Sequence, residues 1–353
     1  MDPAACDRIA DAAIVDLLRL QEDIGVDLVT DGELRRDNFY SFVAHKLSGV
    51  RLMTLAEMLE IIEDKAAFER ILQTLDVPAY SISNPTCVGR IERRAPLAAD
   101  ELRFARRHTS KPIKVTLPGP YLLTRAMFVK EATAAVYGSK EELAEDVVRV
   151  LVEEIAELSA EGADFIQLDE PVLTELVFAQ GKTRTFMCAA LASTQDPTAE
   201  LELAVQLLNR VLPAAGDVRT GLHVCRGNWS QDESTLLRGG YPPLRPWFDR
   251  IGVDQLVLEF ATERAGSLLA FEGKELGLGV VNPRTARVEP VAEVREAIAA
   301  ALRLYPAERL FLNPDCGFAT FSNRPVNEGG IATRKMRTVV EAARSLRDQA
   351  AGP

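Results

Sequence analysis

The stretch Leu158–Glu170 reads LSAEGADFIQLDE, and its order of residue types decides the fold. A helix end is followed by a glycine at the predicted C′ position, then by a short apolar strand, and then by carboxylates where the strand stops. The same order recurs in residues 20–33, LQEDIGVDLVTDGE, and in residues 248–259, FDRIGVDQLVLE. The glycines are Gly25, Gly162 and Gly252. Three such units predict a parallel sheet whose strand ends line the ligand side of a barrel or a doubly wound sheet.

Other segments extend this pattern to seven strand ends. The further predicted strands are 112–117, 220–225, 276–281 and 310–312, and the predicted amphipathic helices are 140–160, 198–212, 290–304 and 333–347. A spacing of roughly forty residues per unit is typical of a (β/α)₈ barrel, which builds its site at the carboxyl ends of its strands. We therefore expect residues 1–353 to form a single TIM-type barrel domain.

One segment, residues 50–107, fits the repeat poorly. It contains a helical part, residues 54–75, and a polar part with β-propensity, residues 79–93. We interpret it as an insertion that covers the mouth of the barrel.

The composition narrows the classes of partner. The chain has 353 residues and a formal net charge of −11, which argues against a nucleic-acid surface or a polybasic membrane patch. No apolar run is long enough to span a membrane, and the first residues do not resemble a signal peptide. We expect a cytoplasmic protein that binds small molecules.

Its five scattered cysteines do not suggest a disulfide framework, and its three histidines make histidine chemistry easy to locate.

The segment around His223 and Cys225 predicts half of a metal site. In a strand, residues i and i+2 face the same side, so both side chains can reach one ion. Glu259 ends another predicted strand and Cys316 follows a third, and strand ends of a barrel converge on one mouth. These four residues offer the nitrogen, sulfur and oxygen ligands of a tetrahedral zinc site. The alternative is that Glu259 is a solvated strand end and Cys316 a small buried residue.

These motifs resemble those of the cobalamin-independent methionine synthase family, and the likeness is greatest to its single-barrel members. The matching segments are Asp31-Gly32-Glu33, Ile166-Gln167-Leu168-Asp169-Glu170-Pro171, His223-x-Cys225, Glu259 and Asn313-Pro314-Asp315-Cys316-Gly317. The resemblance implies a zinc-containing (β/α)₈ barrel that alkylates a thiol, with His223, Cys225, Glu259 and Cys316 on the zinc. It also implies that Glu33 and Asp169 hold the amino group of a thiol such as homocysteine.

The residue types fit thiol chemistry independently of the resemblance. A free thiol has a pKa of roughly 8.5, so little of it is thiolate at neutral pH, whereas zinc deprotonates a thiol that it binds. Glu259 is the ligand expected to yield when the substrate sulfur arrives, because oxygen holds zinc less firmly than thiolate does. Asp315 is expected to orient a ligand. For Glu33 and Asp169 the alternative role is helix N-capping.

Further substrate residues follow from position. Glu170 is assigned to the substrate together with Asp169. Arg284, with Arg35 and Arg36, is a candidate for holding an anionic donor or acceptor, and the alternative for each arginine is an ordinary ion pair.

Two departures from the family pattern bear on the methyl donor. Family members begin with a strand that contacts the substrate backbone, whereas this chain begins at the helix after it, so either the true start lies upstream of Met1 or the barrel closes in another way. Members that use methyltetrahydrofolate carry Asp-x-His after the seventh strand, and this chain has Asn282-Pro283-Arg284. We also expect no counterpart of the folate-assisting amino-terminal half of the long synthases. A corrinoid protein or a small methylated metabolite is therefore expected as donor, rather than unaided polyglutamylated methylfolate.

Three hypotheses follow. The first is zinc-dependent methyl transfer to homocysteine or a related thiol. The second is an epoxide-opening transferase that uses coenzyme M, whose sulfonate would favour Arg284 or Arg35 over Asp169. The third is a zinc-binding barrel without catalytic activity.

Overall fold

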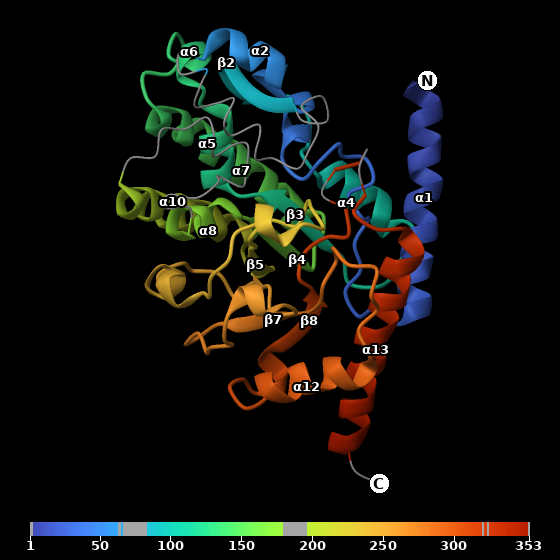
Figure 1. Ribbon diagram of the computed structural model, residues 1–353. Helices are drawn as coiled ribbons and strands as arrows, with labels where there is room; N and C mark the ends of the chain where they lie inside the picture. Colours follow the sequence, from blue (N-terminus) through green and yellow to red (C-terminus); the bar gives the residue numbers. More distant parts are fainter. Residues whose placement is uncertain are drawn as a thin grey trace.

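The computed structural model describes residues 3–62, 65, 83–178, 196–319, 321–322 and 325–351. Its main sheet has six parallel strands in the order β3-β4-β5-β6-β7-β8, surrounded by helices (Figure 1). The strands are β3 (Lys114–Pro118), β4 (Phe165–Asp169), β5 (Arg219–Val224), β6 (Gln255–Leu258), β7 (Glu275–Val281) and β8 (Leu310–Pro314). The architecture is the predicted α/β barrel, and all six strands lie where the sequence places them.

The helices alternate with these strands. They are α1 (Pro3–Ile24), α2 (Leu55–Ile61), α4 (Ala99–Arg106), α5 (Pro120–Met127), α6 (Lys130–Thr133), α7 (Lys140–Ala160), α8 (Val172–Phe178), α10 (Pro197–Val211), α11 (Arg245–Phe248), α12 (Val291–Ala301) and α13 (Gly329–Ala351). Short 3₁₀ helices are η1 (Ser41–His45), η3 (Leu212–Ala215), η4 (Glu233–Thr235), η5 (Pro242–Leu244), η6 (Glu263–Ala265) and η7 (Ala307–Arg309). The four predicted amphipathic helices correspond to α7, α10, α12 and α13. None of the helices that the structure describes is long and apolar enough to cross a membrane.

The seventh predicted strand is reduced to a single bridge. Val29, in the segment after α1, pairs in parallel with Ile113 just before β3. Within the described ranges no strand joins Val29 to β8, the position at which a first barrel strand would lie. Helices α1 and α13 run side by side along this part of the molecule (Figure 1).

Two of the three predicted C′ glycines have the expected conformation. Gly25 after α1 and Gly162 after α7 have φ of 91° and 80°, a region open to glycine without a steric penalty. The prediction for Gly252 is wrong. Helix α11 ends earlier, at Phe248, and Gly252 instead donates its backbone N–H to Asn209 Oδ1 at 2.7 Å without a left-handed φ.

The predicted insertion contains an antiparallel ribbon of β1 (Leu47–Thr54) and β2 (Ser83–Arg93). Strand β2 packs against α5, α6 and α7, at the upper end of the view in Figure 1. Helix α2 covers part of the predicted helical stretch, and the rest of that stretch falls largely outside the described residues. Helix α4 packs on α1 and α7, so it belongs to the barrel. The inserted part therefore ends before residue 107, the end predicted from the sequence. That the segment covers the mouth stays a prediction.

Candidate metal centre

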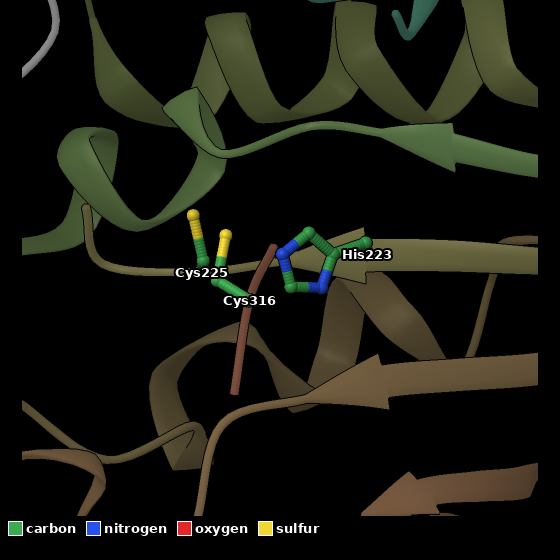
Figure 2. A group of neighbouring side chains, drawn as sticks. All are labelled: His223, Cys225 and Cys316. Carbon is green, nitrogen blue, oxygen red and sulfur yellow. The ribbon is translucent and has the colours of Figure 1, made fainter. Parts of the chain in front are cut away.

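Strands β5 and β8 bring three predicted metal ligands together. His223 lies on β5, Cys225 follows its last residue, and Cys316 follows β8. One ligand atom from each of the three lies within 4.8 Å of the other two. Figure 2 shows the two sulfur atoms side by side with the imidazole ring beside them. Two thiols and an imidazole at this spacing are the donor set of a zinc site.

The imidazole of His223 is oriented for coordination through Nε2. Its Nδ1 lies 2.9 Å from the carbonyl oxygen of Val257 on β6, and this contact assigns the proton to Nδ1. Nε2 is buried and has no hydrogen-bond partner among the described residues. A buried ring nitrogen without a partner beside two thiols costs free energy unless something binds it, so the residues present fit a metal ion.

The three side chains also influence each other's protonation. A hydrogen bond from Cys316 lowers the pKa of Cys225, and the same pairing raises the pKa of Cys316. Burial alone would disfavour the charged form of His223, but its contact with Cys225 outweighs burial and raises the pKa of the imidazole to about 9. The cluster therefore already favours a thiolate at Cys225, which is the form that binds metal.

Glu259, the fourth predicted ligand, lies near this cluster but is bound elsewhere. Its Oε2 accepts from the backbone N–H of Arg226 at 3.0 Å and from Arg226 Nη1 at 3.2 Å. Its Oε1 accepts from Asn228 Nδ2 and, at 3.3 Å, from Arg264 Nη2. The structure does not bring Glu259 into the group of converging ligand atoms, and its role as fourth ligand stays a prediction.

Asp315 ties the end of β8 to the end of β6. Its Oδ1 accepts the backbone N–H groups of Phe260 and Ala261, both at 2.9 Å, so it fixes the segment directly after Glu259. Burial, with the nearby Glu259 charge, raises the pKa of Asp315 to about 7. This position, between the residues that carry Glu259 and Cys316, supports the predicted orienting role.

Sequence reasoning missed one residue that orders the site. The Tyr241 hydroxyl donates to the carbonyl of Val224 at 2.8 Å and accepts the backbone N–H of Glu259 at 3.0 Å. It thereby joins the ends of β5 and β6, and Arg226 stacks on its ring at 3.9 Å. No pattern in the sequence marks this tyrosine, because along the chain it lies in a loop many residues away from the ends of both strands.

Two of the predicted substrate residues line the same end of the barrel. Asp169 is the last residue of β4 and lies opposite His223 in the sheet register. Burial raises its pKa to about 6, and Gln167 Nε2 donates to its Oδ1 at 2.7 Å. Glu33 accepts from Thr116 Oγ1 at 2.6 Å and pairs with Arg36 at 3.4 Å. Glu33 is the one non-glycine residue with positive φ, 55°, in the described part of the chain, and such strain is frequent at functional sites.

Glu170 caps a helix in the structure, and its substrate role stays a prediction. It is fully buried, and its carboxylate accepts the backbone N–H groups of Tyr121 and Leu122 at the start of α5. Both oxygens therefore cap a helix. Burial raises the pKa of Glu170 to about 8.

The predicted anion-binding arginines are paired within the protein. Arg284 is buried, and it donates to Asn228 Oδ1 at 3.2 Å and to Glu233 Oε1 at 2.6 Å. Arg36 pairs with Glu101 at 2.7 Å, and Arg35 pairs with Asp11. Ordinary ion pairs, the alternative considered from the sequence, therefore account for Arg35 and Arg36. Arg284 keeps one buried nitrogen, Nη1, without a partner among the described residues.

Known proteins of similar sequence are methionine synthases and a homocysteine methyltransferase. The family model described as cobalamin-independent synthase, catalytic domain, matches residues 2–345. A methionine synthase of Thermococcus kodakarensis is 30% identical over 347 residues, which cover 97% of this chain and 84% of that protein. A 5-methyltetrahydropteroyltriglutamate–homocysteine methyltransferase of Thermotoga petrophila is 23% identical over 94% of this chain and 39% of its own length.

A solved structure shows the same fold. The B12-independent methionine synthase from Shewanella sp. W3-18-1, in complex with selenomethionine, superposes with a TM-score of 0.73 at 22% identity. The match covers 98% of this chain and 89% of the Shewanella chain. With the family model spanning nearly the whole sequence, the chain is a methyltransferase and belongs to the catalytic-domain family of the cobalamin-independent methionine synthases.

Proposed function

We propose that the protein is a zinc-dependent S-methyltransferase whose acceptor is homocysteine or a closely related amino-acid thiol. The observation that carries the proposal is the convergence of Cys225, Cys316 and the unpartnered Nε2 of His223 within 4.8 Å. A zinc ion bound there would keep a coordinated acceptor thiol deprotonated and nucleophilic at neutral pH.

The residues around the cluster favour an acceptor that carries an ammonium group. Asp169 lies opposite His223, and Glu33 carries a carboxylate whose side chain is 32% exposed. A carboxylate in a partly desolvated site binds an ammonium through charge-assisted hydrogen bonds. The selenomethionine bound to the Shewanella protein is an amino acid of this kind.

The coenzyme M alternative requires a cation that can meet a sulfonate. Arg35, Arg36 and Arg284 all form ion pairs with carboxylates, so none is presented as a free cation to the cluster. Lys114 also lies near Cys316, but burial lowers the pKa of its ammonium, and the carboxylates of Asp169 and Glu33 lie close to it. This arrangement favours the amino-acid thiol over a sulfonate.

The methyl donor is less closely defined by the site. Arg284 occupies the segment after β7 in which family members that use methyltetrahydrofolate carry a histidine, and a guanidinium stays protonated throughout the physiological range. We propose a small methylated metabolite whose leaving group needs no proton from this segment. The comparisons lend no support to a corrinoid protein as donor.

The first experiment tests the metal. Cys316→Ser removes one of the three converging ligands, so purified protein is expected to lose stoichiometric zinc in elemental analysis. Cys6→Ser, which changes an exposed cysteine outside the cluster, is the matched control and is expected to keep its zinc. Zinc at the wild-type level in Cys316→Ser would show that the assigned ligand set is wrong.

The second experiment tests the acceptor. Isothermal titration of zinc-loaded protein with homocysteine and with coenzyme M compares an ammonium-bearing thiol with a sulfonate-bearing thiol. We expect homocysteine to bind, and Asp169→Asn to weaken its binding by roughly tenfold or more, since a hydrogen bond between charged groups is lost. Preferential binding of coenzyme M would support the epoxide-opening alternative. Binding of neither thiol would leave the zinc-binding barrel without catalytic activity.

A further inference from the structure

The buried arginine after β7 has one donor group that the described part of the protein leaves unused. Arg284 is 1% exposed. Its Nε donates to Asn228 Oδ1 at 3.2 Å, and its Nη2 donates to Glu233 Oε1 at 2.6 Å. Its Nη1 is buried and has no hydrogen-bond partner among the described residues. A buried donor without an acceptor is costly, so this nitrogen points to a partner from outside the chain.

The loop that carries Arg284 is fixed by buried contacts. The backbone N–H of Arg284 donates to Asn282 Oδ1 at 3.0 Å, and the backbone N–H of Asn282 donates to Glu289 Oε1 at 2.9 Å. Glu289 also accepts from Lys335 on α13 at 2.8 Å, and the side chain of Lys335 is fully buried. The guanidinium is therefore presented from a rigid loop and is not the mobile end of a surface side chain.

Glu233 is the exposed member of the ion pair with Arg284. Its side chain is 40% exposed, and it lies in the short helix η4. Only its Oε1 binds Arg284, whereas its Oε2 lies 3.7 Å from Nη2 of Arg238, whose side chain is 67% exposed. The hydrogen bond from Arg284 lowers the pKa of Glu233, so the carboxylate is ionised at neutral pH. Glu233 can therefore leave Arg284 and keep a cation beside it at the surface.

Another arginine near the same loop binds a carboxylate more completely. Arg287 Nη1 donates to Glu293 Oε1 at 3.0 Å, and Arg287 Nη2 donates to the other oxygen, Oε2. Two parallel hydrogen bonds of this kind are stronger and more specific than one. Arg284 offers the same two nitrogens, but Glu233 uses only Nη2. A carboxylate that met both nitrogens would satisfy the unused donor, which Glu233 does not do.

The position of Arg284 indicates which reactant would bring that carboxylate. Its partner Asn228 lies in the turn that follows Cys225, so Arg284 is close to the candidate metal centre. Asp169, proposed to hold the ammonium of the acceptor, ends β4, and strands β5 and β6 separate β4 from β7 in the sheet. The ammonium and the carboxylate of an amino acid are attached to the same carbon. An acceptor held at Asp169 therefore keeps its carboxylate near Asp169, and Arg284 is left for the methyl donor.

From these contacts we propose that Arg284 is a specificity-determining residue that binds a carboxylate of the methyl donor through Nη1 and Nη2. Glu233 occupies this carboxylate site before the donor binds, and it turns outward to Arg238 when the donor arrives. The inference rests on the proposed function for the methyl transfer. It adds the chemical class of the donor, which is a small methylated compound that carries a carboxylate.

Glu233→Ala tests the carboxylate site directly, because it removes the competing carboxylate and keeps Arg284. One hydrogen bond between charged groups corresponds to about tenfold or more in an equilibrium constant. We therefore expect the zinc-loaded variant to bind acetate, a minimal carboxylate probe, at least about tenfold more tightly than wild type does. Titration with isotope-labelled acetate, followed by NMR, measures both affinities. Acetamide, which has the same shape without the charge, is expected to show no such gain.

Two further variants locate the bound acetate. Glu293→Ala is the matched control, because it removes a carboxylate from an arginine pair that is exposed on both sides, and it is expected to give no gain. In Glu233→Ala/Arg284→Gln the gain should disappear. An unchanged acetate affinity in Glu233→Ala would overturn the carboxylate site, and so would an equal gain in Glu293→Ala or a gain that persists in the double variant. Glu233 and Glu293 are both at the surface, so their comparison stands even if the double variant is unstable.

Saturating homocysteine shows which reactant the site serves. If Arg284 binds the donor, the acetate affinity of Glu233→Ala is the same with and without homocysteine. Exclusion of acetate by homocysteine, or by coenzyme M, would assign Arg284 to the acceptor and overturn the assignment to the donor.

The same titrations separate this inference from the proposed function. If the wild-type protein binds neither zinc nor homocysteine, the proposed function fails and the donor class fails with it. The acetate affinities of Glu233→Ala and its controls still decide whether Arg284 forms a carboxylate site.

Discussion

Single carboxylates in this barrel differ in function according to what surrounds them. Asp169 and Glu170 are adjacent at the end of β4, yet Asp169 lies opposite His223 in the sheet whereas Glu170 caps α5. Successive residues of a strand point to opposite faces, so one faces the interior of the barrel and the other faces the helices. The sequence Asp-Glu indicates a polar strand end, and only the direction of each side chain favours Asp169 over Glu170 for the proposed substrate role.

The cap at Glu170 predicts a distinctive pH dependence of stability. Its pKa is raised to about 8 from an ordinary value of 4.5, so the folded state binds the proton more tightly than the unfolded state does. Glu170 therefore makes the free energy of unfolding fall as pH rises from about 4.5 to about 8, by up to about 1.4 kcal/mol per pH unit. Glu170→Gln removes this contribution, so the difference in unfolding free energy between variant and wild type should shift in favour of the variant at high pH.

Denaturant unfolding of both proteins at pH 5 and pH 8, in the same metal state, measures that shift. Exposed carboxylates contribute equally to wild type and variant and cancel in the difference. A difference that is the same at both pH values would contradict the raised pKa of Glu170.

At the scale of elements, helix α7 joins the β1–β2 ribbon to the barrel. Glu154 on α7 is fully buried and accepts the backbone N–H groups of Leu97, Ala98 and Ala99 at 2.7, 2.7 and 2.9 Å, at the start of α4. It also pairs with Arg93 at the end of β2, at 2.6 Å. The Glu154 side chain thus accepts hydrogen bonds from the backbone N–H groups at the start of α4, and it also fixes the end of the β1–β2 ribbon.

Glu154→Ala is therefore expected to destabilise the protein by about 3–5 kcal/mol, because it leaves Arg93 and three backbone donors without their partner. Denaturant unfolding followed by circular dichroism measures the loss. Glu153→Ala on the same helix is the matched control. Among the described contacts Glu153 forms an exposed pair with Arg149, and its loss is expected to cost less than about 0.5 kcal/mol. Similar losses in the two variants would show that Glu154 does not have this joining role.

For the whole molecule, the candidate metal centre links strands that are distant in the sequence and in the sheet. His223 and Cys225 come from β5, and Cys316 comes from β8, three positions further along the sheet. An ion that is bound to all three side chains binds the folded protein and not the unfolded chain, in which these side chains are far apart. Metal binding is therefore coupled to the stability of the barrel.

Removal of zinc by a chelator should accordingly lower the thermal unfolding temperature of the wild-type protein. When free zinc exceeds its dissociation constant about a thousandfold, the expected stabilisation is about 4 kcal/mol. Cys316→Ser should unfold at the same temperature with and without zinc, and magnesium should stabilise neither protein, because the site offers sulfur and nitrogen ligands. Equal stabilisation of wild type and Cys316→Ser by zinc would place the ion elsewhere.

The sequence by itself determined the barrel and the residues that approach its mouth. The periodic order of helix, glycine, strand and carboxylate places β3 to β8 and the ends that carry Asp169, His223 and Cys316, because backbone geometry fixes which residues end a strand. This is local information, and it needs no knowledge of distant contacts.

Only the tertiary structure decided which partners the strand-end carboxylates have. The four hydrogen bonds on Glu259 and the helix cap at Glu170 join residues that are far apart in the sequence. Carboxylates are alike in sequence, and their chemistry depends on burial and on the donors around them. The physical environment created by folding therefore distinguishes carboxylates that the sequence alone cannot tell apart.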